Sequence, residues 1–386
     1  MHYCMITRNL IFLLLIVLAC SNAFSQTKQT KKVIDSIDKL IAANLDKSAI
    51  EGIAYALVDT DSTLWSTGFG YADKESKCHM TDTSITNFAS VSKPLTAVGI
   101  MMLDQKKIID IHKPVEFYLN SWKLPSTKYD KSKVTIKNIL QHRAGLSLMS
   151  VPFFDCDSTA PTVINVLEGN SSESKPVSVK FLPDSSWIYS GGGYSVLELM
   201  TEDVTGTSFF NFMQSNLFSP LGMQNSSFEY VQPNQSCDVK HYDEGGKSIK
   251  PYFTVASAAG GLNSTSKDMG LFLQELIKMY SGKSELLSKE SFDTMIKTTT
   301  PVNLSKFGIN KKGVECGLGL FVHNSKDDIV VYHSGGNPGV IAYIIISLKK
   351  EKGLVLVSNS DNAKPLVQKV LQLWGKLNNV SMPFFF

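Results

Sequence analysis

Hydrophobic residues change their spacing along the chain, and each change predicts a different kind of element. In residues 31–45 they recur three and four positions apart, which indicates an amphipathic helix. Two β-prone runs, residues 52–58 and 64–69, follow on either side of a short polar turn. This pattern predicts an antiparallel hairpin early in the chain.

Helical spacing dominates from residue 90 to about residue 270, where the connections are rich in proline and serine. Within this part, residues 150–176 have little periodicity, and we expect them to form a surface loop. The end of the chain is rich in β-branched residues again, with runs at 340–348 and 354–358 before a helical run at 363–377. We therefore expect a meander of antiparallel strands that ends in a helix.

The first 25 residues have the pattern of a secretory signal peptide. Arg8 supplies the positive charge of the first segment, and small residues precede Gln26 at the expected cleavage site. The apolar stretch between them, residues 10–19, is shorter than a transmembrane helix requires. We therefore expect an exported protein, periplasmic or secreted, whose mature chain starts at Gln26. The alternative is a lipoprotein that is cut before Cys20 and carries lipid on that cysteine.

Composition narrows the functional classes. The chain has 386 residues, a formal net charge of +3 and 43% hydrophobic residues, which is typical of a globular enzyme. So small a basic excess gives no case for nucleic-acid binding, and nothing in the sequence implies an obligate protein partner. The histidines show no His-x-x-x-His or His-x-His spacing, so we expect no metal site and no other cofactor.

Four cysteines would remain after removal of the signal peptide, and they lie far apart without a Cys-x-x-Cys pair: Cys78, Cys156, Cys237 and Cys316. In an oxidising compartment they allow one or two disulfides, but spacing alone leaves their connectivity open.

The strongest chemical signal is the pair Ser90 and Lys93. If a helix begins near Ser90, Lys93 lies one turn later on the same face, so its amine can reach the serine hydroxyl as a base. The helix N-terminus would add unpaired N–H groups where an oxyanion develops. Other serines also precede a lysine by three positions, but Ser90 alone among them is followed by a long apolar run that can bury the helix.

A second stretch, Tyr189-Ser190-Gly191-Gly192-Gly193, precedes a helical run at residues 195–204. Consecutive glycines let the backbone turn tightly near a ligand, and we expect them to hold Tyr189 on a loop. A phenol is a poor base at pH 7 unless a cation lowers its pKa, and we expect Lys93 to be that cation.

A third stretch, His333-Ser334-Gly335-Gly336, opens the β-rich tail. Gly335 would let a substrate lie alongside this strand as an extra edge, and the N–H of Gly336 is a candidate oxyanion donor.

In this order of motifs, Ser-x-x-Lys, Tyr-Ser-x and His-x-Gly, the chain resembles the serine β-lactamase-like superfamily. It is most similar to the class C β-lactamase and DD-peptidase branch, the serine hydrolases of peptidase family S12. The resemblance covers the mature chain, because connecting segments at residues 138–146, 220–223 and 258–262 are similar as well.

The resemblance implies an α/β (α+β) fold of the β-lactamase/transpeptidase type. In it, an antiparallel sheet flanked by helices forms one lobe, about residues 30–89 and 271–386, and a mainly helical lobe spans about residues 90–270 of the single domain 26–386.

The family roles carry over by matching positions. Ser90 is expected to be the acylated nucleophile, with Lys93 and Tyr189 as the proton-transfer pair. The backbone N–H groups of Ser90 and Gly336 are expected to form the oxyanion hole, and His333 to lie on the cleft wall.

Two departures from the family pattern bear on the substrate. Gly191 stands in place of the asparagine of Tyr-x-Asn, so an amide that would hold an acylamino group is missing. His333-Ser334-Gly335 replaces Lys-Thr-Gly, which exchanges a permanent cation for a group that is mostly neutral at pH 7. Both changes weaken the case for a specialised β-lactamase.

We therefore expect an exported serine hydrolase that cleaves a small-molecule or peptide ester or amide through a Ser90 acyl-enzyme. The alternatives are an acyltransferase that passes the acyl group to an alcohol or amine, a D-amino-acid peptidase or β-lactamase, and a non-catalytic sensor of cell-wall ligands.

Overall fold

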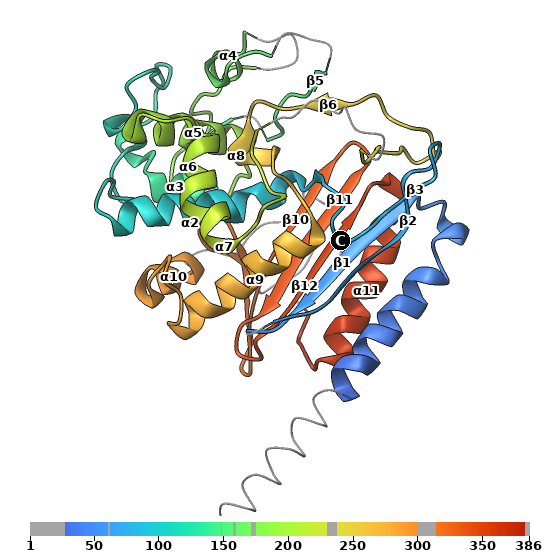
Figure 1. Cartoon of the computed structure of the whole chain (residues 1–386). Helices are drawn as coiled ribbons and strands as arrows, with labels where there is room; N and C mark the ends of the chain where they lie inside the picture. Colours follow the sequence, from blue (N-terminus) through green and yellow to red (C-terminus); the bar gives the residue numbers. More distant parts are fainter. Residues whose placement is uncertain are drawn as a thin grey trace, which may run out of the picture.

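The centre of the molecule is an eight-stranded antiparallel sheet (Figure 1). The computed structural model describes residues 28–60, 62–147, 149–156, 160–170, 175–229, 238–298 and 314–382. The strand order is β3-β2-β1-β12-β11-β10-β9-β8. The strands are β1 (Gly52–Val58), β2 (Thr63–Asp73), β3 (Cys78–His79), β8 (Glu315–Cys316), β9 (Phe321–Asn324), β10 (Ile329–Asn337), β11 (Val340–Ser347) and β12 (Lys352–Ser358).

The sheet joins the two ends of the chain. β1 pairs with β12, so that Ile53 lies opposite Ser358, and every residue of β1 is buried. Such two-sided burial explains why β1 reads as a continuous apolar run rather than an alternating one. The predicted hairpin and the predicted tail meander are both confirmed, and so is the mixed α/β class with its large antiparallel sheet.

Helices cover both faces of the sheet. An N-terminal helix over residues 28–42 and α11 (Lys364–Leu377) lie side by side on one face, where Ile37 and Trp374 belong to the same apolar core (Figure 1). On the other face α9 (Ser266–Ser281) contacts β1 and β12.

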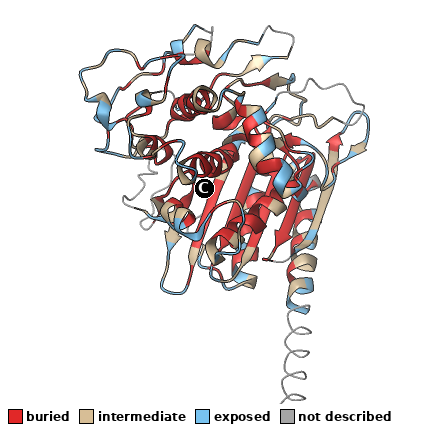
Figure 2. Ribbon diagram, turned by 60° about the vertical axis from the view of Figure 1, so that its left-hand side comes forward, coloured by how far each residue is buried: buried red, intermediate tan, exposed pale blue. Residues whose placement is uncertain are grey.

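In the described part of the chain between β4 (Thr86–Asn87) and β8, helices are the main regular elements. The first of them, α2 (Ser92–Gln105), is buried from Ser92 to Leu103, which fits a helix enclosed on all sides (Figure 2). The others are α3 (Ile136–Leu140), α4 (Val163–Glu168), α5 (Gly191–Thr205), α6 (Phe209–Met213), α7 (Ser219–Leu221), α8 (Ser257–Gly260) and α10 (Lys289–Ile296). Two small sheets pair β4 (Thr86–Asn87) with β7 (Asn263–Ser264) and β5 (Phe154–Asp155) with β6 (Tyr252–Phe253).

The expectation that the three glycines form a tight turn is wrong, because they are the first turn of α5, but Tyr189 does lie on a loop, directly before the cap residue Ser190. Ser190 caps this helix by accepting a hydrogen bond from the N–H of Gly193 at 3.0 Å. A Cβ at Gly193 would lie 3.0 Å from Ile139 Cγ2, and one at Gly191 would lie 3.0 Å from Val151 Cγ1. The glycines are therefore needed for close packing against neighbouring segments, and not for a turn.

The expected surface loop at residues 150–176 contains a helix, α4, in its described part. Thr162 and Asn165 form a capping box at its start. The helix has only six residues, which is too short for helical periodicity to be recognised in the sequence.

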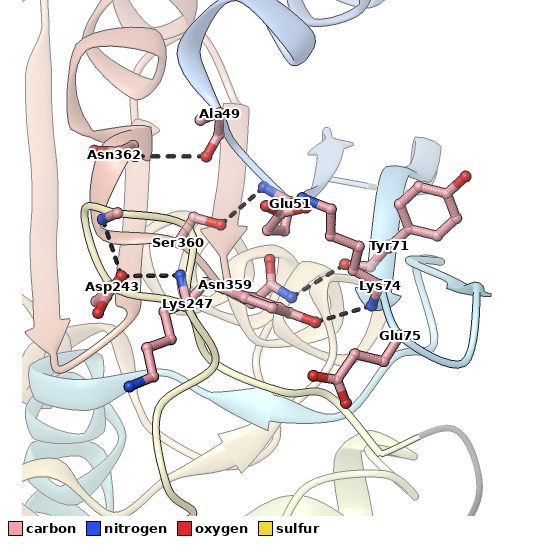
Figure 3. Close-up of polar contacts among 12 residues, drawn as sticks. Ala49, Glu51, Tyr71, Lys74, Glu75, Asp243, Lys247, Asn359, Ser360 and Asn362 are labelled. Carbon is pink, nitrogen blue, oxygen red and sulfur yellow. Dashed lines mark hydrogen bonds and ion pairs between the residues drawn. The ribbon is translucent and has the colours of Figure 1, made fainter.

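A polar cluster fastens the chain after β12 to the residue before β1 and to the end of β2 (Figure 3). The amide of Asn359 donates hydrogen bonds to the backbone oxygens of Tyr71, Ala72 and Lys240, at 2.9–3.2 Å. The hydroxyl of Ser360 accepts the N–H of Glu51 at 2.9 Å. Asp361, the next residue, accepts the N–H of Gly339 at 2.8 Å, so the same polar cluster also holds the turn that follows β10.

Several predictions concern residues beyond the described ranges. The signal peptide and Cys20 lie outside them, as does Cys237. Cys78 is disulfide-bonded, whereas Cys156 and Cys316 carry thiols. Within the described ranges, no helix combines the length and apolar character needed to cross a bilayer.

Candidate active site

Ser90 stands on a tight turn, the 3-10 helix Ala89–Val91, immediately before α2. Ala89 has a φ of +48°, in the left-handed region that is costly for a residue other than glycine. Two side chains hold this conformation. Asn87 Oδ1 accepts the Ala89 N–H at 2.9 Å, and Ser92 Oγ donates to the Ala89 carbonyl at 2.6 Å. The serine is thus presented on a strained but well-supported turn.

Lys93 lies one turn after Ser90, as predicted, and its side chain is almost fully buried. Its Nζ donates hydrogen bonds to Ser90 Oγ at 3.1 Å and to the Ala259 carbonyl at 2.5 Å. Burial lowers the pKa of Lys93 to about 7, because an ammonium ion is poorly solvated there. At neutral pH a large fraction of this amine is therefore uncharged and able to accept the serine proton.

The phenol of Tyr189 is hydrogen-bonded to Ser90. Its ring centroid is 4.8 Å from Lys93 Nζ. Burial raises the pKa of Tyr189 above its usual value, so the expectation that a cationic Lys93 lowers that pKa is wrong. The physical reason is that burial disfavours both charges: the lysine loses its proton near neutral pH while the phenol keeps its own.

His142 is a site residue that sequence reasoning missed. Its ring centroid lies 4.2 Å from that of Tyr189, and its Nδ1 accepts the N–H of Ser190 at 3.1 Å. Burial and the nearby Lys93 hold the pKa of His142 well below its usual range, so the ring is neutral. The sequence marked this residue only as part of the connecting segment 138–146, and no local pattern connects it with Tyr189.

His333 and Gly335 belong to β10, which packs beside the turn that carries Ser90. Burial and the nearby Lys93 lower the pKa of His333 to about 3, so this imidazole is neutral at any physiological pH. A Cβ at Gly335 would lie 2.4 Å from the Phe88 carbonyl oxygen and 3.1 Å from Ser90 N. Only glycine therefore lets this strand approach the serine turn so closely. At Gly336, by contrast, the nearest atom to an added Cβ would be 3.9 Å away.

These residues surround one pocket of about 360 Å³. Its lining includes Ser90, Lys93, Tyr189, Gly191, His333 and Gly336, while Gly335 is packed behind the wall. Aromatic rings of Trp187, Phe321 and Tyr332 cover part of it, and Lys364 is its second charged side chain. The described lining contains no Asp, Glu or Arg. No group of three or more potential metal ligands (His, Cys, Asp or Glu) occurs in the described part of the chain.

Comparison with known sequences gives a consistent result. Residues 37–374 match the Beta-lactamase family. Penicillin-binding protein 4* of Bacillus subtilis strain 168 is 27% identical over 327 residues, which cover 80% of this chain and 68% of that protein. Protein flp of Staphylococcus aureus strain N315 is 23% identical over 343 residues, covering 86% and 64%. This chain thus spans about two thirds of the length of these relatives.

Solved structures share the fold. The octameric penicillin-binding protein homologue from Pyrococcus abyssi superposes with a TM-score of 0.75 at 23% identity, covering 91% of this chain and 79% of that one. D-amino acid amidase from Ochrobactrum anthropi SV3, complexed with L-phenylalanine, gives a TM-score of 0.73 at 20% identity, covering 90% and 98%. The family match spans most of the sequence and agrees with the resemblance of the motifs, so the chain belongs to the Beta-lactamase family and is a serine hydrolase.

Proposed function

We propose that the protein is an exported hydrolase that cleaves an ester or amide through an acyl-enzyme on Ser90. The observation that carries this proposal is the 3.1 Å contact between Ser90 Oγ and Lys93 Nζ, together with the pKa of about 7 to which burial lowers Lys93. A base is most effective when its pKa is close to the working pH.

The first half of the reaction forms the acyl-enzyme. Neutral Lys93 accepts the proton of Ser90 as its Oγ bonds to the substrate carbonyl carbon. The carbonyl π electrons move onto oxygen, where the backbone N–H groups of Ser90 and Gly336 stabilise the oxyanion. When the tetrahedral intermediate collapses, the bond to the leaving group breaks. Tyr189 passes its phenol proton to the leaving alcohol or amine and is reprotonated by the Lys93 ammonium.

The second half releases the acyl group. Water attacks the ester carbonyl and gives up a proton to Lys93, directly or through Tyr189. Collapse of the second intermediate breaks the bond to Ser90 Oγ, which recovers its proton from the same pair. If an alcohol or amine takes the place of water, the same steps make the protein an acyltransferase, so the two outcomes differ only in the acceptor.

We further propose substrates with an uncharged group beside His333. The imidazole is neutral because its pKa is about 3, so position 333, unlike Lys364 elsewhere in the lining, supplies no cation that would pair with a carboxylate. Aromatic side chains at Trp187 and Phe321 favour an apolar acyl or leaving group. These features support an esterase or amidase more than a β-lactamase.

Export is the second part of the proposal. We expect cleavage before Gln26, or before Cys20 if the protein is lipid-anchored. The N-terminal mass of protein recovered from the cell envelope distinguishes the two, since only the second form carries acyl chains. An N-terminus at Met1 in the cytoplasmic fraction would refute both.

The test of the chemistry is intact mass after brief exposure to a fluorophosphonate, benzylpenicillin and a p-nitrophenyl ester. We expect a phosphonyl adduct on the wild type and none on Ser90→Ala. Ser347 also precedes a lysine by three positions, but it lies on β11, away from the pocket lining, and Ser347→Ala is the matched control that should still be labelled.

Each result has a defined meaning. A lasting penicilloyl adduct would favour a penicillin-binding activity over an esterase. Added methanol or an amine that captures the acyl group faster than water does would favour acyl transfer. If the folded wild type acquired no adduct from any probe, the acyl-enzyme proposal would be wrong.

A further inference from the structure

Asn87, three residues before Ser90, has a side chain whose hydrogen-bonding capacity is filled by protein atoms. Its Oδ1 accepts the Ala89 N–H at 2.9 Å and Asn337 Nδ2 at 2.6 Å. Its Nδ2 donates to the carbonyls of Gly260 and Leu262, each at 3.2 Å. Because two bonds go to each end of the amide, little capacity remains for a substrate. This side chain therefore connects parts of the protein instead of binding a ligand.

Asn337 is the last residue of β10 and follows Gly336 directly. The bond between Asn337 and Asn87 thus joins the strand that carries one candidate oxyanion donor to the turn that carries the other. The two residues are 250 positions apart in sequence, so chain connectivity does not keep them together. A weaker contact of 3.4 Å from Asn337 to the Gly260 carbonyl ties α8 into the same group.

We propose that the hydrogen bond between Asn87 and Asn337 is a latch that sets the spacing between the N–H groups of Ser90 and Gly336. This inference rests on the proposed acyl-enzyme function. Oxyanion donors act only when they lie within hydrogen-bond reach of the developing oxyanion, and small displacements cost much of the rate. Asn87 and Asn337 are positioning residues in this account, because neither touches the reacting atoms.

Two further features explain why a latch is needed at this place. Gly335 allows β10 to come within van der Waals contact of the serine turn, but contact alone does not fix the position of the strand along the turn. Ala89 has a φ of +48°, which is strained for a residue other than glycine, and Asn87 Oδ1 accepts its N–H in this conformation. One amide therefore stabilises both the strained turn and its alignment with β10.

The test compares p-nitrophenyl acetate with its thionoester, in which sulfur replaces the carbonyl oxygen. Sulfur is larger and accepts hydrogen bonds weakly, so an aligned oxyanion hole favours the oxygen ester. We expect Asn87→Ala and Asn337→Ala each to lower kcat/KM for the oxygen ester by about 10- to 100-fold. The oxygen-to-sulfur rate ratio should fall about tenfold, by the same loss of oxyanion stabilisation.

The rate ratio is independent of the folded fraction of enzyme, which cancels, so a merely structural role would not change it. The double variant should be no slower than the slower single variant, because both substitutions remove the same bond. Asn263→Ala is the matched control, since Asn263 pairs with Asn87 across β4 and β7 while its side-chain amide donates to the Gly261 carbonyl and not to β10. It should keep the wild-type ratio.

The outcomes separate the two proposals. A wild type that shows neither Ser90-dependent acylation by the ester nor Ser90-dependent phosphonylation by a fluorophosphonate would overturn the proposed function and the latch with it. An active wild type whose ratio is unchanged in Asn87→Ala and Asn337→Ala, or effects that simply add in the double variant, would overturn the latch alone.

Discussion

Lys93 Nζ lies 3.1 Å from Ser90 Oγ and also donates to the carbonyl of Ala259. The hydrogen bond to the Ala259 carbonyl holds the amine beside the serine. Unlike a carboxylate, a carbonyl has no negative charge that would keep the amine protonated. In the described pocket lining no acidic side chain opposes the loss of the proton. The Ala259 carbonyl thus fixes the position of the Lys93 amine, and burial lowers its pKa.

The rate of acylation should therefore follow the protonation of Lys93. We expect kcat/KM for a neutral ester to rise with pH through a single inflection near pH 7, because only the uncharged amine accepts the serine proton. His333 adds no inflection above pH 4, since its pKa is about 3. Stopped-flow acylation between pH 5 and 9 measures this profile.

A permanent cation at position 93 should slow the reaction strongly, because it cannot accept the serine proton. Lys93→Arg is expected to lower kcat/KM by about 10²- to 10⁴-fold, the usual contribution of a general base. Lys113→Arg, at an exposed lysine, is the control for the substitution itself. A bell-shaped profile centred elsewhere, or an active arginine variant, would show that another group is the base.

The pH dependence of the free energy of unfolding should also reflect the pKa of Lys93. Burial lowers the pKa of Lys93 from 10.5 to about 7, so between these values the unfolded chain binds one more proton than the folded one. The free energy of unfolding therefore rises with pH in this window, and the contribution is lost as the pH falls through about 7. Relative to Lys93→Met, the slope should be about 1.4 kcal/mol per pH unit.

Urea unfolding of both proteins at intervals from pH 7 to 10 gives that difference directly. Other groups cancel in the comparison, because the two chains differ at one position. A difference that is constant with pH would mean that Lys93 keeps its proton in the folded protein, and would also remove the basis for the inflection expected in the rate.

His142 should act on the rate through Tyr189. His142→Asn keeps a residue that tolerates the left-handed backbone found here, with a φ of +57°, but removes the ring that packs on the phenol. We expect kcat to fall about tenfold with KM little changed, as small misplacements of a catalytic group do. Tyr189→Phe should cost more, about 10²-fold or above, because it removes the proton relay itself.

His112→Asn, at an exposed histidine, is the matched control and should behave as the wild type. If His142→Asn raised KM without lowering kcat, the ring would have a role in substrate binding instead. An unchanged Tyr189→Phe variant would leave proton transfer to Lys93 alone.

Local spacing was sufficient to predict the N-terminal hairpin, the tail meander and the pairing of Ser90 with Lys93. The single sheet that joins both ends of the chain was predicted only by the resemblance to the family, because β1 and β12 are far apart in sequence. Local spacing was insufficient for His142, whose contact with Tyr189 exists only after two distant segments have packed together. The role of Gly191 and Gly193 was misjudged for a similar reason. A glycine that allows a turn and a glycine that allows close packing look identical until the neighbours, here Val151 and Ile139, are in place.

Protonation states were the other feature that spacing could not predict. A lysine near a tyrosine suggests a cation that lowers the pKa of the phenol, and this holds in water. In the folded protein, burial instead raises the pKa of Tyr189 and lowers the pKa of Lys93, because it destabilises the charged form of each group. Only the three-dimensional environment shows that both groups are neutral, Lys93 because it loses its proton near neutral pH and Tyr189 because it keeps its own.

Gly335 and Gly336 are neighbours with different requirements. Gly335→Ala should destabilise the protein by about 1–3 kcal/mol, because its Cβ would overlap the Phe88 carbonyl at 2.4 Å and push β10 from the serine turn. Gly336→Ala meets no atom closer than 3.9 Å and should leave the free energy of unfolding within about 0.5 kcal/mol of the wild type. Thermal and urea unfolding of both variants test the contrast, which equal stabilities would contradict.

The charge at position 333 should decide which substrates the site prefers. His333→Lys places an ammonium where the wild type has a neutral ring, and a charge-assisted bond to a carboxylate contributes about 1.5–3 kcal/mol. We therefore expect acylation by benzylpenicillin to gain about 10- to 100-fold relative to a neutral ester. The new cation should also move the inflection of Lys93 below pH 7, because two nearby positive charges disfavour each other.

His333→Gln is the matched control, since it keeps a neutral polar side chain and should preserve the wild-type preference. The measurement is the ratio of acylation rates for the two substrates in all three proteins, with the pH profile of each. If the ratio in His333→Lys stayed at the wild-type value while the inflection moved, the new ammonium would be near Lys93 but out of reach of the substrate. The neutral ring would then not be what excludes carboxylates, and another part of the pocket would have to set the preference.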